Sequence, residues 1–188
     1  GGGSKADDSS AHAGNGRSNG HAAPPESEIA RGVLTAVEAE EGPSQRPFDF
    51  GPGRRVLITR DDAGLSDALA DCIVRRGATC EIIDPARANV ETLAGDAPAA
   101  LLLVAPCDES DERWLQSCFA LLRAVGRAWN GTTSTGERAL ISIARLDGAF
   151  GLHDVTGPTL SGALAGLVKS AAHEWSDVRA IAFDVTAN

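Results

Sequence analysis

In the second part of the chain, short apolar runs alternate with longer stretches whose apolar residues recur every three or four positions. Short apolar runs between turn residues are typical of buried strands, and the three-to-four spacing is typical of one helix face. The helical spacing is clear in residues 64–77, where the apolar positions are Leu65, Leu69, Cys72 and Ile73. The pattern predicts strands at residues 54–59, 79–84, 98–106, 138–145 and 178–185, and helices at residues 64–77, 111–129 and 159–175.

Strands that alternate with helices predict a single fold class. Each strand–helix–strand unit makes a right-handed crossover, so the strands are expected to lie parallel with helices on both faces of the sheet. Residues 98–106 are apolar along their length, which is typical of a strand covered on both faces. The predicted fold is therefore α/β, a Rossmann-like parallel sheet of about five strands flanked by helices.

The residues before the first predicted strand have a different composition. Residues 1–27 are mainly Gly, Ser, Ala, Asn and Pro, which predicts a disordered, flexible linker. Residues 28–41 carry apolar residues at every fourth position, so a short helix is possible there, either within the linker or docked on a neighbouring domain. The predicted organisation is a linker at residues 1–47 with a possible helix at 28–41, followed by a Rossmann-like domain at residues 48–188.

The charge and apolar content narrow the class of partner. The chain carries 17 Lys and Arg against 26 Asp and Glu, a formal net charge of −9, which disfavours nucleic acid and anionic membrane surfaces as partners. No apolar stretch approaches the roughly 20 residues of a membrane span, and the polar N-terminus does not resemble a signal peptide. We expect a cytoplasmic protein.

Metal-binding and disulfide patterns do not stand out in the sequence. No two cysteines have C-x-x-C spacing, and each lies within an apolar pattern, so we expect reduced, buried thiols that pack as small apolar residues. His12 and His21 lie in the polar linker and are interpreted as ordinary polar residues. No metal ligand is predicted. The four cysteines are Cys72, Cys80, Cys107 and Cys118.

The turn after the first predicted strand lies where a dinucleotide-binding domain keeps its glycine-rich phosphate loop. Glycines there permit a tight turn, let backbone N–H groups approach the pyrophosphate and let the helix pack close to the strand. A short-chain dehydrogenase reads Thr-Gly-x-x-x-Gly-Ile-Gly, whereas residues 59–66 read Thr-Arg-Asp-Asp-Ala-Gly-Leu-Ser. Only Thr59, Gly64 and the aliphatic Leu65 match, so side chains stand where bare backbone is needed.

Two aspartates in this turn argue further against a phosphate site. Asp61 and Asp62 place negative charge near the expected phosphates, and a like-charge contact at about 4 Å costs on the order of 4 kcal/mol at an effective dielectric constant of about 20. Arg60 could neutralise part of that charge. We interpret both aspartates as flanking the helix N-terminus and stabilising its dipole. Asp84 stands in the place of a ribose-binding acid but is interpreted as a turn residue before Pro85, so no cofactor-binding residue is predicted.

Residues 157–185, GPTLSGALAGLVKSAAHEWSDVRAIAFDV, resemble the dehydrogenase segment that runs from Tyr-x-x-x-Lys through Gly-Leu to a final strand. In that family the Tyr donates a proton to the substrate carbonyl and the Lys lowers the pKa of the Tyr. Alignment on Gly166 and Leu167 leaves none of these groups in place, and the chain contains no tyrosine. The Tyr position holds Gly157, the Lys position holds Ser161, and the position of the substrate-binding Ser holds Ala144 or Arg145.

Neighbouring residues do not restore the site. Pro158, one residue away, is no better placed, and Lys169 and His173 lie four residues apart on one predicted helix, where they are interpreted as a solvated face. No catalytic residue is therefore predicted.

Residues 52–188 resemble the structural subdomain of a ketoreductase in polyketide and polyunsaturated-fatty-acid synthases. The segments that carry the resemblance are ARLDGAFG, SGALAGLVKSAAHEW and VRAIAFDV. The resemblance implies a truncated, non-catalytic Rossmann layer that braces a second, catalytic half, absent from this chain. That half binds NADPH and reduces the β-ketoacyl group on the phosphopantetheine arm of a carrier protein. The implied partners are the catalytic half and neighbouring synthase domains, including the carrier protein.

Two other functions remain open. The chain could be an independent nucleotide-binding or sensor domain with a degenerate Rossmann loop, or a protein-interaction adaptor that docks through residues 28–41. A lone structural half should expose an apolar surface to its partner. The candidates for that surface are LLLVAP (residues 101–106), LISIARL (residues 140–146) and the last helix.

Overall fold

The computed structural model describes residues 35, 47–88, 93, 97–107, 112–132, 136–155 and 158–186. The predicted linker at residues 1–27 and the possible helix at 28–41, apart from Thr35, lie outside the described residues. The elements reported below belong to one unit, Leu34–Asn188. The domain boundary at residue 48 therefore stays a prediction.

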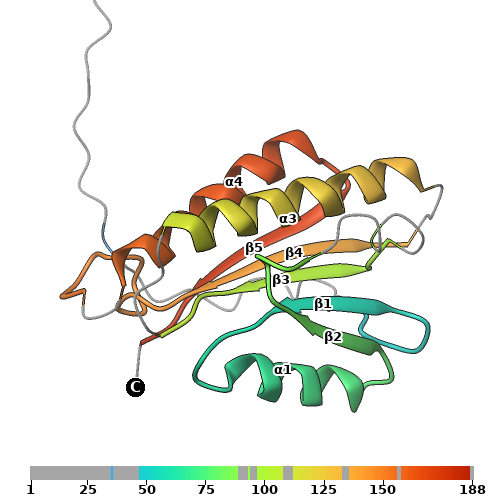
Figure 1. Ribbon diagram of the computed structural model, residues 1–188, viewed down its shortest axis with the longest axis horizontal. Coiled ribbons are helices and arrows are strands. Elements are labelled where there is room, and N and C mark those ends of the chain that lie inside the picture. The colour runs from blue at the N-terminus through green and yellow to red at the C-terminus, as the bar shows by residue number, and fades with distance from the viewer. Residues whose placement is uncertain are drawn as a thin grey trace, which may run out of the picture. The chain divides into compact units, whose positions relative to one another are not determined.

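Five parallel strands form one sheet in the order β2-β1-β3-β4-β5 (Figure 1). The predicted α/β fold is confirmed, and the predicted elements agree with the observed ones to within a few residues. The main difference is that the predicted helix at 159–175 begins as a separate 3₁₀ turn. The elements are β1 (Arg55–Thr59), α1 (Leu65–Val74), β2 (Thr79–Ile83), β3 (Ala100–Val104), α3 (Glu112–Gly131), β4 (Arg138–Ala144), η1 (Thr159–Gly162), α4 (Ala163–Glu174) and β5 (Val178–Asp184).

The helices lie on both faces of the sheet, as right-handed crossovers require. Along the sheet, β2 lies on one side of β1, whereas β3, β4 and β5 follow one another on its other side. Because the crossovers have one handedness, α1 covers one face of the sheet and α3 and α4 cover the opposite face (Figure 1). Alternate residues of each central strand face the two layers. In β3, for example, Leu101 and Leu103 pack in the cluster under α3 and α4, whereas Leu102 and Val104 pack in the cluster under α1.

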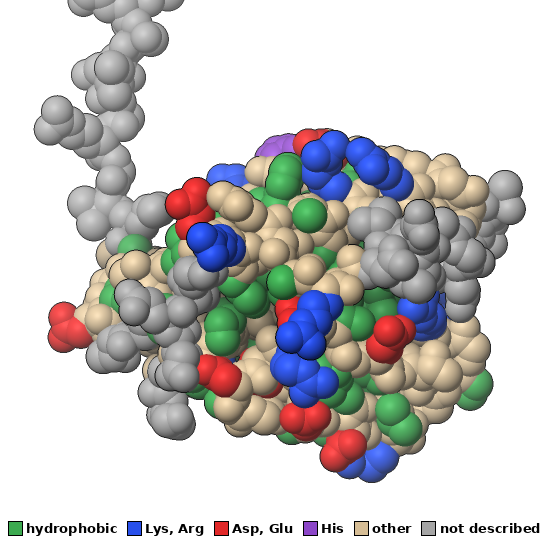
Figure 2. Space-filling view, in the orientation of Figure 1, with side chains coloured by type: hydrophobic (Ala, Val, Ile, Leu, Met, Phe, Trp, Pro, Cys, Tyr) green, Lys and Arg blue, Asp and Glu red, His purple; other side chains and the backbone are tan. Residues whose placement is uncertain are grey.

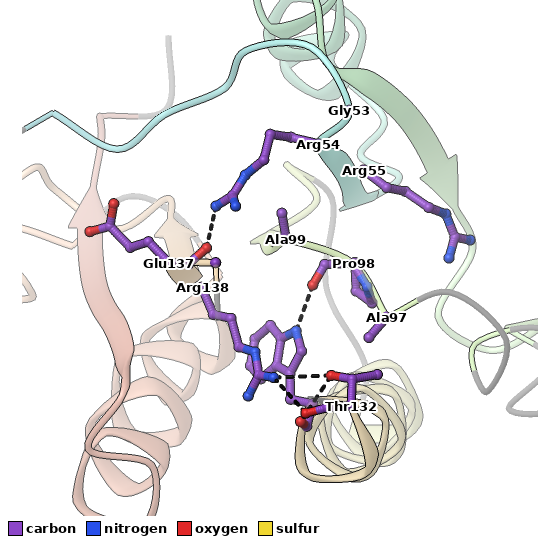
Figure 3. Close-up of a pocket in the computed structure, with 11 residues that line it drawn as sticks. Gly53, Arg54, Arg55, Ala97, Pro98, Ala99, Thr132, Glu137 and Arg138 are labelled. Carbon is purple, nitrogen blue, oxygen red and sulfur yellow. Dashed lines mark hydrogen bonds between the residues drawn. The ribbon is translucent and has the colours of Figure 1, made fainter. Parts of the chain in front are cut away.

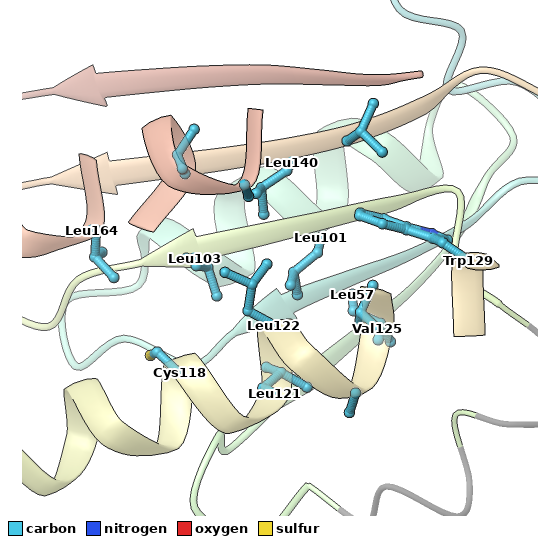
Figure 4. Close-up of a cluster of buried hydrophobic side chains, with 14 of the residues drawn as sticks. Leu57, Leu101, Leu103, Cys118, Leu121, Leu122, Val125, Trp129, Leu140 and Leu164 are labelled. Carbon is cyan, nitrogen blue, oxygen red and sulfur yellow. The ribbon is translucent and has the colours of Figure 1, made fainter. Parts of the chain in front are cut away.

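The larger apolar cluster lies between the sheet and the two helices α3 and α4 (Figure 4). Trp129 of α3 is buried there, and its indole N–H donates to the carbonyl of Pro98 at 2.6 Å. Its ring also meets the ring of Trp175, which follows α4, edge to face at 5.6 Å between centroids. These contacts fix the end of α3 against the start of β3 and the end of α4.

The carboxyl ends of all five strands lie at one edge of the sheet, because the strands are parallel. The strand order reverses between β1 and β3, since the chain leaves β1 toward one side and later returns to the other. In open α/β sheets, ligands bind in the crevice outside such a reversal point. The residues that follow β1, β3 and β4 therefore define the place to look for a site. None of the helices in the described part of the chain combines the length and apolarity that a membrane crossing needs.

Candidate functional site

The carboxylate of Asp61 lies at the N-terminus of α1. Its Oδ2 accepts hydrogen bonds from the backbone N–H groups of Ala63 and Leu65, each at 3.1 Å, and its Oδ1 accepts one from Ser66 N at 2.9 Å. Leu65 and Ser66 open the helix, where backbone N–H groups have no intrahelical partner and the dipole is positive. A dinucleotide places its pyrophosphate at this position. The prediction that Asp61 stabilises the helix N-terminus is confirmed.

Local hydrogen bonds hold the turn in shape. The hydroxyl of Ser66 donates to the carbonyl of Thr59 at 2.8 Å and accepts from Asp61 N at 3.1 Å. The hydroxyl of Thr59 accepts from Val104 N at 2.8 Å and donates to Val104 O at 3.1 Å, so the turn is tied to β3. Gly64 has a φ of 80°, a left-handed conformation that favours glycine and accounts for this retained glycine.

Arg145, directly after β4, pairs with Asp61. Its Nη2 donates to Asp61 Oδ2 at 2.9 Å, and its Nε donates to the carbonyl of Ala105 at 3.2 Å. The Arg145 side chain is 8% exposed and the Asp61 side chain is fully buried. The guanidinium therefore spans the carboxyl ends of β1, β3 and β4. This arginine stands at one of the two positions that the alignment gave to the substrate-binding Ser.

The negative charge of Asp61 is balanced by Arg145 and not by the neighbouring Arg60. Arg60, which the sequence offered as one possible source of positive charge, is exposed, and the buried partner of Asp61 is Arg145. Asp62 does not cap α1 through its Oδ1, which accepts a hydrogen bond from Cys107 N just after β3. The carboxylate of Asp61 holds the N–H groups of Leu65 and Ser66 at the start of α1.

The pKa of Asp61 is lowered from its usual value of 3.8. Burial alone raises this pKa, but the hydrogen bonds from the backbone and hydroxyl of Ser66 and from the backbone of Leu65 and Ala63 outweigh it. The carboxylate is therefore ionised at neutral pH and supplies the negative charge that Arg145 and the helix N-terminus require.

Two further carboxylates, those of Asp147 and Asp184, order the loop after β4. Asp147 accepts hydrogen bonds from the backbone of Ala149, Gly151 and His153 at 2.7–2.9 Å. Asp184, at the end of β5, accepts from the backbone of Leu146, Asp147 and Phe150 at 2.8–3.3 Å. The hydrogen bond from Gly151 N–H holds the pKa of Asp147 well below its usual range. The N–H groups of His153 and Ala149 lower this pKa further, and together these hydrogen bonds outweigh desolvation, which raises it. The loop is thus wound around the side chains of Asp147 and Asp184.

The positions that correspond to catalytic residues do not form a site in the described structure. Gly157 lies outside the described residues, and Pro158 precedes η1. Ser161 is buried, and its hydroxyl accepts a hydrogen bond from Arg145 N at 3.3 Å. Lys169 and His173 are exposed on α4, consistent with a solvated helix face.

Asp84 is a turn residue, as predicted. Its Oδ1 accepts a hydrogen bond from Ala86 N at 2.9 Å, and its carboxylate meets Arg87 Nε at 3.4 Å on the surface. Both partners lie within three residues of it in the chain. The carboxylate is therefore engaged in its own turn.

The cysteines are free thiols, as predicted, but only one is fully buried. Cys118 of α3 lies in the core, and burial raises the pKa of its thiol to about 12. Cys72, Cys80 and Cys107 are partly exposed. Within the described ranges, no three His, Cys, Asp or Glu side chains gather closely enough to hold a metal ion.

The expected partner-facing segments are largely buried, which corrects that part of the sequence analysis. In residues 101–106 and 140–146, nearly every side chain lies in the core because β3 and β4 are central strands. On the face shown in Figure 2, apolar side chains are scattered between acidic and basic ones. The exposed large apolar residues in the described structure include Val74, Phe119, Phe150, Leu152, Val155 and Phe183.

Fold and site together define a class: a parallel, doubly wound α/β layer with a buried ion pair, Asp61 with Arg145, at the carboxyl ends of its central strands. No family model matches the chain, and no curated protein matches it. The geometry of the described residues is therefore the basis for the function proposed below. Sequence reasoning marked Asp61 and Arg145 separately but missed their pairing, for which no local pattern gives a signal.

Proposed function

We propose that the chain is the non-catalytic structural half of a ketoreductase in a multifunctional polyketide or fatty-acid synthase of the cytoplasm. In this role it braces a catalytic half that binds NADPH and reduces β-ketoacyl groups on a carrier protein. The chain itself supplies neither the cofactor site nor the proton donor.

The observation that carries the proposal is the buried pair of Asp61 and Arg145. A pyrophosphate at the N-terminus of α1 needs the N–H groups of Leu65 and Ser66, and both already donate to Asp61. The cofactor would have to displace an ionised carboxylate and leave Arg145 without its partner. Truncating one side of a buried ion pair costs about 3–5 kcal/mol. This cost opposes NADPH binding and favours a bracing role.

The loop after β4 suits docking on another domain. Phe150 and Leu152 are 49% and 42% exposed, and the loop that carries them is held by Asp147 and Asp184. Phe150 also has a φ of 56°, a left-handed conformation that is costly for a bulky residue and often marks a functional position. A loop that is already ordered loses little conformational entropy on binding. We assign this loop, residues 146–153, to the contact with the catalytic half.

Calorimetry tests the absence of a cofactor site. We expect no saturable heat when NADPH or NADH is titrated into the purified chain up to about 1 mM. This concentration is high enough to detect a dissociation constant well above the micromolar values usual for cofactors of such enzymes. Micromolar binding would instead support an independent nucleotide-binding module.

Co-expression with a ketoreductase catalytic half tests the bracing role. We expect the two proteins to co-elute, and the double variant Phe150→Asn and Leu152→Ser to weaken the complex by about tenfold or more. Asn is chosen because it tolerates the left-handed backbone. The control is Val74→Ser, which removes a similarly exposed apolar residue from α1. Equal binding by the double variant and the control would exclude the loop as the contact.

A further inference from the structure

A cavity of about 210 Å³ lies at the amino edge of the sheet, opposite the pair of Asp61 and Arg145. Figure 3 shows its walls, which come from the starts of β1 and β4, the segment before β3 and the end of α3. The cavity is much larger than a single water requires, yet smaller than the roughly 300 Å³ typical of sites for drug-sized ligands. Its size suits a small ion or one terminal group.

Arg54 supplies an unbalanced positive charge to this cavity. Its Nη2 donates to the backbone carbonyl of Glu137, and its guanidinium lies 5.1 Å from the ring centroid of Phe48. Its Nε is buried and has no hydrogen-bond partner among the described residues. A buried donor without an acceptor is costly. No carboxylate in the described part of the chain forms an ion pair with this arginine.

The other charged residues in the cavity wall are neutralised by partners. In Figure 3 the side chains of Arg55 and Glu137 extend away from the cavity on opposite sides, whereas Arg138 extends along its wall toward Thr132. Arg54 therefore gives the cavity a net positive charge, although the whole chain carries −9. The ion pairs are Arg55 with Glu81 at 2.8 Å, Arg138 with Asp177 at 3.2 Å and Arg179 with Glu137 at 2.8 Å.

We infer that this cavity binds a small oxyanion, a phosphate or carboxylate group, through the guanidinium of Arg54. A guanidinium presents planar N–H donors that match the oxygen atoms of both groups, and such charge-assisted hydrogen bonds are strong. The anion would accept from a terminal N–H of the guanidinium and balance the charge of Arg54. The inference is independent of the proposed bracing role, because it concerns the opposite edge of the sheet and other residues.

Titration of the full chain followed by NMR tests this inference. Inorganic phosphate and acetate are the two probes, and NaCl keeps the ionic strength constant so that general screening does not contribute. Trp129 lines the cavity, so its indole N–H signal should shift in a saturable way with a dissociation constant in the millimolar range. The indole signal of Trp114, which does not line the cavity, is the internal control. The stronger of the two probes identifies the anion class.

Substitution of Arg54 then locates the contact. We expect Arg54→Gln to weaken binding of the stronger probe by about tenfold or more, because it removes a charge-assisted hydrogen bond. The matched control is Arg87→Gln, which removes an exposed arginine elsewhere and should leave binding unchanged. The inference fails if neither anion shifts the Trp129 signal of the unaltered chain, or if both substitutions weaken binding equally. The first of these outcomes does not depend on the variant being folded.

Discussion

Asp61 accounts for the chemistry of the turn between β1 and α1. Its carboxylate accepts hydrogen bonds from backbone N–H groups at the helix N-terminus, and its negative charge neutralises the buried guanidinium of Arg145. Both effects need an ionised side chain at one position of the turn. The bound carboxylate occupies the N–H groups that an external anion would need at this helix end.

The substitution Asp61→Asn tests this account at the residue scale. At neutral pH we expect a loss of about 3–5 kcal/mol in the free energy of unfolding, because Arg145 stays buried without its charged partner. Chemical denaturation of the variant and the unaltered chain measures the difference. The matched control is Asp84→Asn, whose surface pair with Arg87 contributes less than about 1 kcal/mol.

The pH dependence of that difference has a definite sign. The folded state lowers the pKa of Asp61 below 3.8, so on acidification the unfolded chain takes up this proton first. The stability from Asp61 is therefore complete above about pH 4 and is lost as pH falls through the lower, folded-state pKa. The gap between Asp61→Asn and the unaltered chain should narrow over that range. A gap that stays constant down to the acid transition would contradict this role.

At the scale of elements, the contact between α3 and the end of α4 depends on one small residue. A Cβ added at Gly126 would lie 2.3 Å from Cζ2 of Trp175, far inside normal contact distance. Trp175 in turn packs against Trp129, so the ring has little freedom to move. Gly126 is therefore present because of close packing rather than for a special backbone conformation.

Two glycine-to-alanine substitutions separate packing from helix propensity. Gly126→Ala should destabilise the protein by about 1–3 kcal/mol, because overpacking outweighs the gain of about 1 kcal/mol from alanine in a helix. Gly166→Ala, in α4, meets nothing within 4 Å and should stabilise by up to about 1 kcal/mol. Thermal unfolding of both variants measures the effects. Similar shifts in melting temperature for the two variants would contradict this packing role.

At the scale of the whole molecule, the segment before β1 belongs to the folded domain. Phe48 and Phe50 pack against the apolar cluster under α1, and their rings meet edge to face at 4.8 Å between centroids. Phe48 also supports the guanidinium of Arg54. Phe48 and Phe50 therefore contribute to the packing of the folded domain.

Two truncations test the predicted domain boundary at residue 48. Removal of residues 1–46 should change the free energy of unfolding by less than about 0.5 kcal/mol, because the sequence places this segment in the linker before the domain. Removal of residues 1–50 should cost about 2 kcal/mol or more, since both phenylalanines are lost. Denaturant unfolding of the two shortened chains gives the comparison. A large loss on removing only residues 1–46 would place the boundary earlier.

Sequence alone determined the elements and their class, because hydrophobic periodicity is a local property of consecutive residues. It also showed that a glycine-rich loop and a tyrosine are missing, since these are matters of residue identity. Asp61 and Arg145 are 84 residues apart in the chain, and only the strand order brings the ends of β1 and β4 together around β3. The strand order likewise decided that residues 101–106 do not form a partner-facing surface, because β3 is a central strand. The tertiary structure decided these points because long-range contacts depend on how strands are ordered, which no local pattern encodes.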